Sequence, residues 1–282
     1  MNGQNTNSQN NSTLKSLLML GLGAGAGILV FELVRRRLNR TRSANAFSPL
    51  VDSIIVTKDG VTSGLMTFGW DDEENCSWAR SVTVDGSGAV IGESLIEVEV
   101  YEDKILTFQG TGEVGDTPIV ANYNLDEYGM VDLVSVRCTG GKEQRYDSTV
   151  VGAELKKSVT DDRVISYEWQ DGNLVGIRTT GGNNIRMSYY KNVENHLFPD
   201  LNALSMPFAP DMLMTYVMGT RSRNYLATME IEAEDRIEHS SFSYLCDKYD
   251  RPVQIIQETT VVSEPEVSDH ARTTYDIKYL NN

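Results

Sequence analysis

The sequence has few of the residues that most often perform chemistry in proteins. Its 282 residues include only three cysteines and three histidines. Cys76, Cys138 and Cys246 are far apart and have no CxxC spacing, which argues against a disulfide framework and against a zinc knuckle. We expect each cysteine to be a small buried residue of a strand. The histidines, which show no HExxH or other ligand spacing, are His196, His239 and His270.

Motifs for a reaction are also missing. No Gly-x-Ser-x-Gly, Ser-x-x-Lys or Cys–His arrangement occurs in a convincing context. His239 and Ser240 are adjacent, but neighbours in a strand point to opposite faces. The stretch from Gly86 to Gly92 has no following helix to bind a phosphate. The stretch from Asp71 to Asn75 lacks the spacing of an EF-hand loop, so a solvated turn is favoured over a calcium site. The sequence thus predicts no catalytic, cofactor-binding or metal-ligating residue.

Positive charge is scarce in most of the chain, whose formal net charge is −15. Residues 1–50 carry six basic side chains against the single acid Glu32, which leaves 19 basic and 39 acidic side chains in residues 51–282. A body with a net charge of −20 repels phosphate backbones, so we exclude nucleic acid as a partner. The acidic surface keeps the body soluble and suits cations or basic partners.

One long apolar run stands near the amino terminus. Residues 1–13 are uncharged and rich in Asn, Gln, Ser and Thr, which predicts a disordered tail. Leu17 to Phe31 is an unbroken run of 15 apolar or glycine residues, and Leu33 and Val34 extend it to 18. At ~1.5 Å per residue, this run reaches roughly 27 Å, close to a hydrocarbon core of ~30 Å. We predict a single transmembrane helix over residues 14–34 and a basic linker over residues 35–50.

Two alternatives to a membrane span stay open. One is a cleaved signal peptide that ends at Ala44-Asn45-Ala46, and the other is a helix that lies on the membrane surface. The arginine cluster between Phe31 and these small residues weighs against cleavage, because it resists translocation.

The flanking charges predict the orientation of the helix. Five arginines follow the span, so the positive-inside rule places the body on the cytoplasmic side of the inner (cytoplasmic) membrane. GxxxG spacings within the span permit close helix–helix approach and hence a homodimer. Their pairs are Gly21 with Gly25 and Gly23 with Gly27.

From Val51 onward the hydrophobic period is two. In "IEVEVYE", Ile96, Val98 and Val100 alternate with two glutamates and a tyrosine, which is typical of an antiparallel strand with one wet face. No strands alternate with helical patterns of 10–15 residues, so a parallel α/β sheet is not expected. We predict a mainly β protein, with one antiparallel β domain over residues 51–282 that forms a large curved meander sheet or a barrel.

Acidic turns recur between the expected strands. "YNLDEYGMVDLVSV" begins at Tyr123, "YEWQDGNLVGI" at Tyr167 and "YLCDKYDRPVQII" at Tyr244. Each has an aromatic strand end, a polar turn that contains Asp, and then aliphatic residues. Tight hairpins need Asp and Gly for positive φ and for local side-chain capping. We therefore interpret these acids as parts of the scaffold rather than as ligand sites.

One stretch, from Val193 to Thr228, departs from the β pattern and contains three prolines. Asp200 can cap a turn of helix, and Asp211 can cap a second one over Met212 to Met218 that Gly219 stops. We predict a short helical crossing near residues 200–220 between two blocks of hairpins. Its Met and Leu residues should fill the end of the sheet rather than form a cofactor pocket.

Besides the hairpins, three stretches carry a resemblance: "FPDLNAL", "VMGTRSRNYLA" with its Gly-x-Arg-Ser-x-Asn core, and the closing "TTYDIKYL". They resemble a Bacteroidota family described as a domain of unknown function with a porin-like fold, and the likeness covers most of residues 64–280. The resemblance implies a strongly curved or barrel-like meander in a soluble protein, and it implies no reaction. Family members are usually exported lipoproteins with a cysteine after the signal peptide. The first cysteine here is Cys76, so the helix is expected to replace the lipid anchor, and a periplasmic body is the alternative to the cytoplasmic one.

Together these features predict a membrane-tethered, β-rich binding or structural module with no recognisable reaction. Its partners would be the lipid bilayer, through residues 14–34, and a protein or glycan ligand on the β surface. The alternative is an envelope hydrolase that acts on a glycan through acidic residues, since a body with 39 acids offers many candidates.

Overall fold

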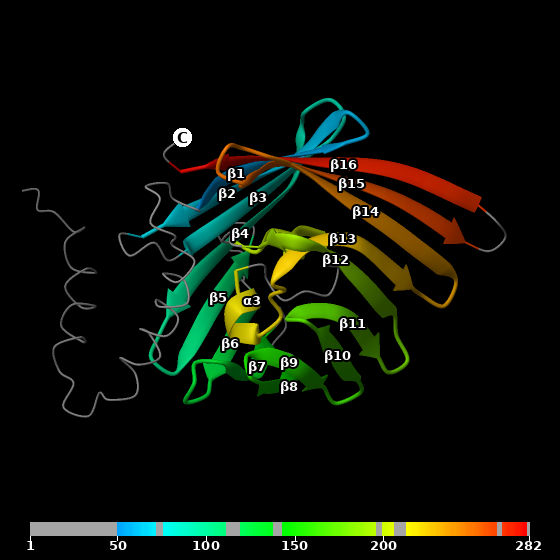
Figure 1. Cartoon of the computed structure of the whole chain (residues 1–282). Coiled ribbons are helices and arrows are strands. Elements are labelled where there is room, and N and C mark those ends of the chain that lie inside the picture. Colours follow the sequence, from blue (N-terminus) through cyan, green and yellow to red (C-terminus); the bar gives the residue numbers. More distant parts are fainter. Residues whose placement is uncertain are drawn as a thin grey trace, which may run out of the picture.

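The computed structural model describes residues 50–71, 76–110, 119–137, 143–195, 199–205, 213–263 and 267–280. Within these ranges the chain forms one antiparallel sheet of sixteen strands that closes into a barrel, since each strand pairs with its neighbours in sequence and β1 pairs with β16 (Figure 1). The strands are β1 (Val51–Lys58), β2 (Val61–Trp70), β3 (Cys76–Val84), β4 (Val90–Val100), β5 (Lys104–Gly110), β6 (Ile119–Leu125), β7 (Val131–Arg137), β8 (Glu143–Val151), β9 (Glu154–Val159), β10 (Val164–Gln170), β11 (Asn173–Thr179), β12 (Asn184–Glu194), β13 (Asn224–Glu232), β14 (Arg236–Cys246), β15 (Pro252–Ser263) and β16 (Val267–Tyr279). The predicted antiparallel meander is confirmed, and of the two forms expected, the barrel is the one observed.

The amino-terminal predictions fall outside the described residues. They are the tail of residues 1–13, the transmembrane helix of residues 14–34 and nearly all of the linker of residues 35–50. None of the helices in the described ranges has the length and apolar character needed to cross a membrane.

The hairpin turns are built as the sequence predicts. Asp171 and Gly172 join β10 to β11 with φ angles of 52° and 76°, and a two-residue turn with positive φ at both positions matches the twist of the strands. The carboxylate of Asp126 accepts hydrogen bonds from the backbone N–H groups two and four residues later, at 2.8 and 2.9 Å. Asp247 does the same in its own turn, at 2.8 and 3.0 Å. These acids therefore serve the scaffold.

The predicted crossing joins β12 to β13 and contains the 3₁₀ helix η1 (Leu201–Ser205) and the short helix α3 (Thr215–Met218). The carboxylate of Asp200 accepts a hydrogen bond from the N–H of Asn202 at 3.1 Å, which confirms the first predicted cap. Figure 1 shows α3 inside the ring of strands rather than along the rim.

The second helix is shorter than the predicted range of 212–218. Its N-cap position is Met214, which makes no side-chain capping bond, and Asp211 lies outside the described residues. Gly219 ends the helix as predicted, with a left-handed φ of 66°.

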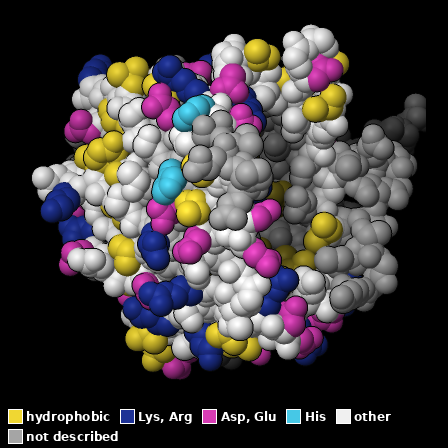
Figure 2. All heavy atoms as spheres, turned by 90° about the vertical axis from the view of Figure 1, so that its right-hand side faces the viewer, with side chains coloured by type: hydrophobic (Ala, Val, Ile, Leu, Met, Phe, Trp, Pro, Cys, Tyr) yellow, Lys and Arg dark blue, Asp and Glu magenta, His cyan; other side chains and the backbone are white. Residues whose placement is uncertain are grey.

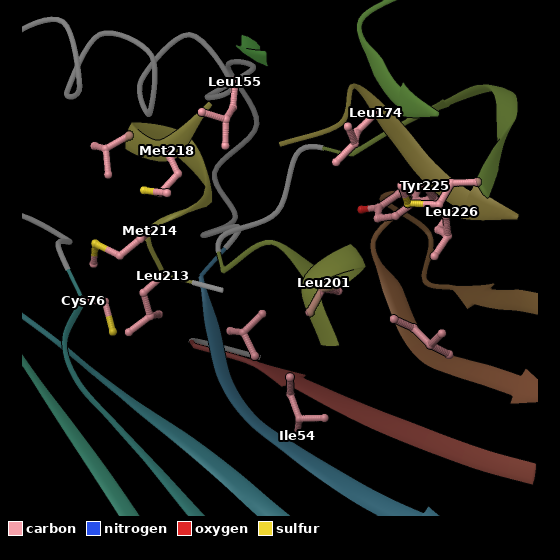
Figure 3. Close-up of a cluster of buried hydrophobic side chains, with 14 of the residues drawn as sticks. Ile54, Cys76, Leu155, Leu174, Leu201, Leu213, Met214, Met218, Tyr225 and Leu226 are labelled. Atoms are coloured by element: carbon pink, nitrogen blue, oxygen red, sulfur yellow. The ribbon is translucent and has the colours of Figure 1, made fainter. Parts of the chain in front are cut away.

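The crossing fills one end of the barrel, which we call the closed end. Figure 3 shows Leu201, Leu213 and Met214 of the crossing among side chains that come from strands around the barrel. The core contains, from the strands, Ile54, Phe68, Cys76, Ile105, Tyr123, Leu155, Leu174 and Leu226, all of them buried. The Met and Leu residues of the crossing thus complete a hydrophobic core.

Three pairs of neighbouring strands part near the closed end. β9 pairs with β10 only over residues 157–159, β11 with β12 only over residues 176–178, and β13 with β14 only over residues 228–232. Backbone groups freed by this separation need other partners, because a buried unpaired carbonyl costs about 1–3 kcal/mol. Aromatic side chains supply some of them: Trp169 donates to the carbonyl of Leu155 at 2.7 Å, Tyr189 to that of Leu174 at 2.6 Å, and Tyr244 to that of Leu226 at 2.8 Å.

The crossing supplies further partners to the separated strands. The N–H of Leu155 donates to the carbonyl of Gly219 at 2.8 Å, and the N–H of Leu174 donates to the hydroxyl of Ser222 at 3.1 Å. The N–H of Arg223 donates to the carbonyl of Gly172 at 2.9 Å. The crossing is therefore bonded into the wall of the barrel as well as packed inside it.

Candidate functional site

A groove lies on the outer face of β13–β16, beside the point where β13 and β14 part. Its volume is about 420 Å³. Ser241 and Ser243 face this groove, whereas Ser240, which alternates with them along β14, is buried inside the barrel. The lining residues are Tyr190, Ala227, Thr228, Ser241, Phe242, Ser243, Ile256, Glu258 and Arg272.

Tyr190 forms one wall of the groove. Its hydroxyl donates to the carbonyl of Phe242 at 2.7 Å, across the gap between β13 and β14. Its ring meets that of Tyr244 edge to face, with centroids 5.8 Å apart and an interplanar angle of 86°. The side chain is nevertheless 39% exposed. The groove therefore has an aromatic side chain that is held by its hydroxyl and by Tyr244 and is partly open to water.

The floor of the groove is a row of cross-strand partners. Thr228, Ser241, Glu258 and Arg272 stand side by side on β13, β14, β15 and β16. Thr228 already shares a hydrogen bond with Ser188 at 2.6 Å. Within the described residues, the hydroxyl of Ser241 has no protein partner, and neither has that of Ser243 in the next row. Both hydroxyls are therefore available to a ligand.

Two opposite charges in this row do not pair with each other. Glu258 and Arg272 are direct cross-strand neighbours, yet within the described chain neither side chain makes an ion pair or a hydrogen bond. Other acid–base neighbours on the exterior do pair, as Arg80 does with Glu93 at 2.7 Å. The groove thus presents one unpaired carboxylate and one unpaired guanidinium, whose charges cancel.

The row next to the groove is charged and paired. Arg186 and His239 both contact the carboxylate of Glu230, at 3.0 and 3.1 Å, and Thr260 hydrogen bonds to His270 at 3.0 Å. On the face shown in Figure 2, acidic, basic and histidine side chains are interspersed and hydrophobic ones are scattered between them. No group of three or more His, Cys, Asp or Glu side chains that could hold a metal ion occurs in the described part of the chain.

The structure separates the residues that the sequence brings close together. Ser240 is buried inside the barrel and His239 lies outside it, as the strand alternation predicts. Cys76 is buried in the core as expected. Cys246 is only half-buried, at the end of β14 beside its turn, and burial together with Asp250 and Asp247 raises the pKa of its thiol. Cys138 and His196 lie outside the described residues.

The glycine-rich stretch of residues 86–92 forms a hairpin. The carboxylate of Asp85 accepts hydrogen bonds from the N–H groups of Ser87 and Ala89 at 2.8 and 3.0 Å, and β4 follows directly from Val90. The stretch is therefore a capped turn that leads into a strand. Of the acidic stretch considered for calcium, Asp71 is described and residues 72–75 are not.

The sequence did not predict the groove. Tyr190 and Arg272 are far apart in the chain, and they line the same groove only because of the strand register and the separation of β13 from β14. The run "HSSFSY" in β14 does place hydroxyls on alternate positions, but this pattern is common to solvated strands.

No family model matches the chain, and no curated protein matches it. Among solved structures, a porin-like protein from Bacteroides uniformis matches with a TM-score of 0.59 and 11% sequence identity, over 82% of this chain and 98% of that one. The chain has a porin-like fold. The porin-like fold implied by the resemblance is thus confirmed, whereas membership of the particular family stays a prediction, since at this identity the likeness shows the fold alone.

Proposed function

We propose that this porin-like barrel is a membrane-tethered binding module. Residues 14–34 would form a single-pass helix in the inner (cytoplasmic) membrane, and the groove on β13–β16 would contact the ligand. The unpaired polar groups of that groove carry the proposal: Ser241, Ser243, Glu258 and Arg272 face outward beside a fixed aromatic ring. A few converging polar groups beside an aromatic side chain are typical of a binding site.

The exterior of the barrel supports tethering by the helix. Pairs such as Arg80 with Glu93 and Arg186 with Glu230 lie on the outer face, well within their strands. An arginine facing lipid at the midplane costs about 2–4 kcal/mol. Such an exterior suits water, and it leaves the contact with the bilayer to the apolar run of residues 14–34.

The interior of the barrel also favours binding over transport. The closed end contains a packed hydrophobic core in which Leu155 and Tyr225 are at most 2% exposed. The crossing is hydrogen-bonded to the nearby strands β9 and β11. A solute would have to displace both the packed core and the crossing to pass through the barrel.

The groove favours binding over hydrolysis. Glycoside hydrolysis uses two carboxyl groups that flank the scissile bond. Among the residues that line the groove, Glu258 is the one carboxylate. The groove therefore has the groups to hold a ligand but lacks the acid–base pair to cleave a glycan.

The tether is tested by fractionation of cells that express either the full chain or a chain that lacks residues 14–34. We expect the full chain to sediment with membranes and to resist extraction at alkaline pH, and the shortened chain to remain in the supernatant. Membrane association of the shortened chain at the same level would refute the tether. Replacing Gly21 and Gly25 by leucine in the full chain should leave sedimentation unchanged and weaken the homodimer expected from the GxxxG spacing.

The side of the membrane is tested by protease digestion with a carboxy-terminal epitope. The positive-inside rule favours a cytoplasmic body, which would be digested only after spheroplasts are lysed. Digestion in intact spheroplasts would place the body in the periplasm, which is the alternative implied by the resemblance to a family of exported lipoproteins.

A further inference from the structure

We infer that the groove on β13–β16 binds a neutral carbohydrate, either a sugar or a short segment of glycan. This inference rests on the proposed function, since it names the ligand class of the same face. Three features of the groove carry it: the fixed ring of Tyr190, the mixed donors and acceptors of the floor, and the cancelling charges.

The ring of Tyr190 suits the apolar face of a sugar. An aromatic ring has a negative face, and the C–H groups that cover one face of a pyranose are weakly positive, so the two pack together. The ring is already held by the hydrogen bond to the carbonyl of Phe242 and by the edge-to-face contact with the ring of Tyr244, and the side chain is still 39% exposed. Little conformational freedom remains to be lost when a ligand packs on it, which favours affinity.

The floor matches the hydroxyls of a sugar. Each sugar hydroxyl both donates and accepts hydrogen bonds. Ser241 and Ser243 do both, Glu258 only accepts, and Arg272 only donates. All four side chains are without a protein partner in the described chain, so a ligand would not have to break an internal bond to reach them.

The charges favour a neutral ligand over an ionic one. Glu258 and Arg272 contribute opposite charges and so give the groove no net attraction for an ion. Residues 51–282 carry a net charge of −20, which repels anionic sugars and phosphorylated ligands. A zwitterionic dipeptide also carries charges that can pair with Glu258 and Arg272, so it is the competing ligand class that the test must include. The groove volume of about 420 Å³ lies within the usual range for small-ligand sites.

The test is a titration of the purified full chain in lipid nanodiscs, followed by saturation-transfer NMR. The neutral probes are N,N′-diacetylchitobiose, cellobiose and maltose, and the contrasting probes are the anionic trisaccharide sialyllactose and the dipeptide Gly-Gly. We expect saturable binding of at least one neutral disaccharide, and neither contrasting probe should compete with it.

Two variants of Tyr190 distinguish the contribution of its ring to binding from that of its hydroxyl. Tyr190→Ala should weaken binding at least about tenfold, because it removes the stacking surface, whereas Tyr190→Phe should change it less than about threefold. Glu258→Gln should weaken binding roughly tenfold, because hydrogen bonds to a charged group are the stronger ones. Glu258 has no partner among the described residues, so this variant tests the groove even if Tyr190→Ala disturbs the gap between β13 and β14. The matched control is Tyr128→Ala in the turn after β6, where the side chain is 68% exposed, and it should have no effect.

Other outcomes would overturn the inference. Binding that Glu258→Gln and Tyr190→Ala leave unchanged would place the sugar elsewhere on the barrel. Binding of sialyllactose or Gly-Gly alone would assign the groove to an anion or a peptide. If no probe binds but a photoreactive residue at position 243 captures a defined membrane partner, the carbohydrate inference fails and the binding module stands. If neither occurs, both fail.

Discussion

Replacing Gly219 by alanine tests whether the crossing is seated against the barrel wall. Gly219 has a φ of 66°, and a left-handed backbone costs a residue with a Cβ atom about 1–2 kcal/mol. A Cβ at this position would also lie 3.0 Å from the backbone nitrogen of Leu155 and 3.1 Å from the carbonyl oxygen of Ala153. Backbone atoms cannot move aside as a side chain can. The hydrogen bond of 2.8 Å between Leu155 and Gly219 should therefore lengthen or break, at a cost of about 1 kcal/mol.

The matched control is Gly181→Ala. Gly181 has a similar φ of 65°, but nothing lies within 4 Å of the site of its Cβ. We expect Gly181→Ala to lower the free energy of unfolding by about 1–2 kcal/mol and Gly219→Ala by about 2–4 kcal/mol. The assay is urea unfolding of residues 47–282 followed by tryptophan fluorescence, since the indole of Trp169 is bonded to the carbonyl of Leu155 and reports on the same place. If the two variants lose the same free energy of unfolding, within ~0.5 kcal/mol, the close packing of the crossing against the barrel wall is refuted.

Three further perturbations test the closed end. Tyr189→Phe removes the hydroxyl that donates to Leu174 and accepts from Ser222, and should cost about 1–3 kcal/mol in urea unfolding. Leu155→Ala should cost about 2–5 kcal/mol in the same assay, because Leu155 is fully buried among side chains of the crossing. Burial raises the pKa of Tyr216 to about 12, so stability should be at its full value below pH ~10 and fall as pH rises toward 12. Phenolate absorbance should show this tyrosine ionising together with unfolding, and its ionisation near pH 10 in a folded barrel would contradict the burial.

Much of the architecture could be predicted because it follows from local patterns. The alternation predicted β4, in which Ile96 and Val98 are half-buried and Glu97 and Glu99 are exposed, although Val100 is exposed rather than on the covered face. The Asp-Gly pair at residues 171 and 172 gives a tight hairpin. A chain of such hairpins can only form a meander. Whether the meander closes depends on the pairing of β1 with β16, between residues that are more than two hundred positions apart. No local pattern contains that information.

The candidate site was less predictable than the fold for the same reason. The groove exists because β13 and β14 part after Thr228 and Ser241, and that separation depends on how the crossing and Tyr244 pack at the closed end. The second helix, Thr215–Met218, is shorter than the predicted range of 212–218, and it lies inside the barrel rather than along the rim. Features that depend on packing between distant segments of the chain cannot be predicted from the local sequence.

The most direct test of the central claim, a water-facing barrel held at the membrane by a separate helix, is purification of residues 47–282 without detergent. We expect a soluble species with a β-rich circular dichroism spectrum and cooperative unfolding, since the outer face carries ion pairs such as Arg186 with Glu230. Recovery of this species only in micelles would contradict a water-facing barrel, because the barrel wall itself would then be the membrane anchor.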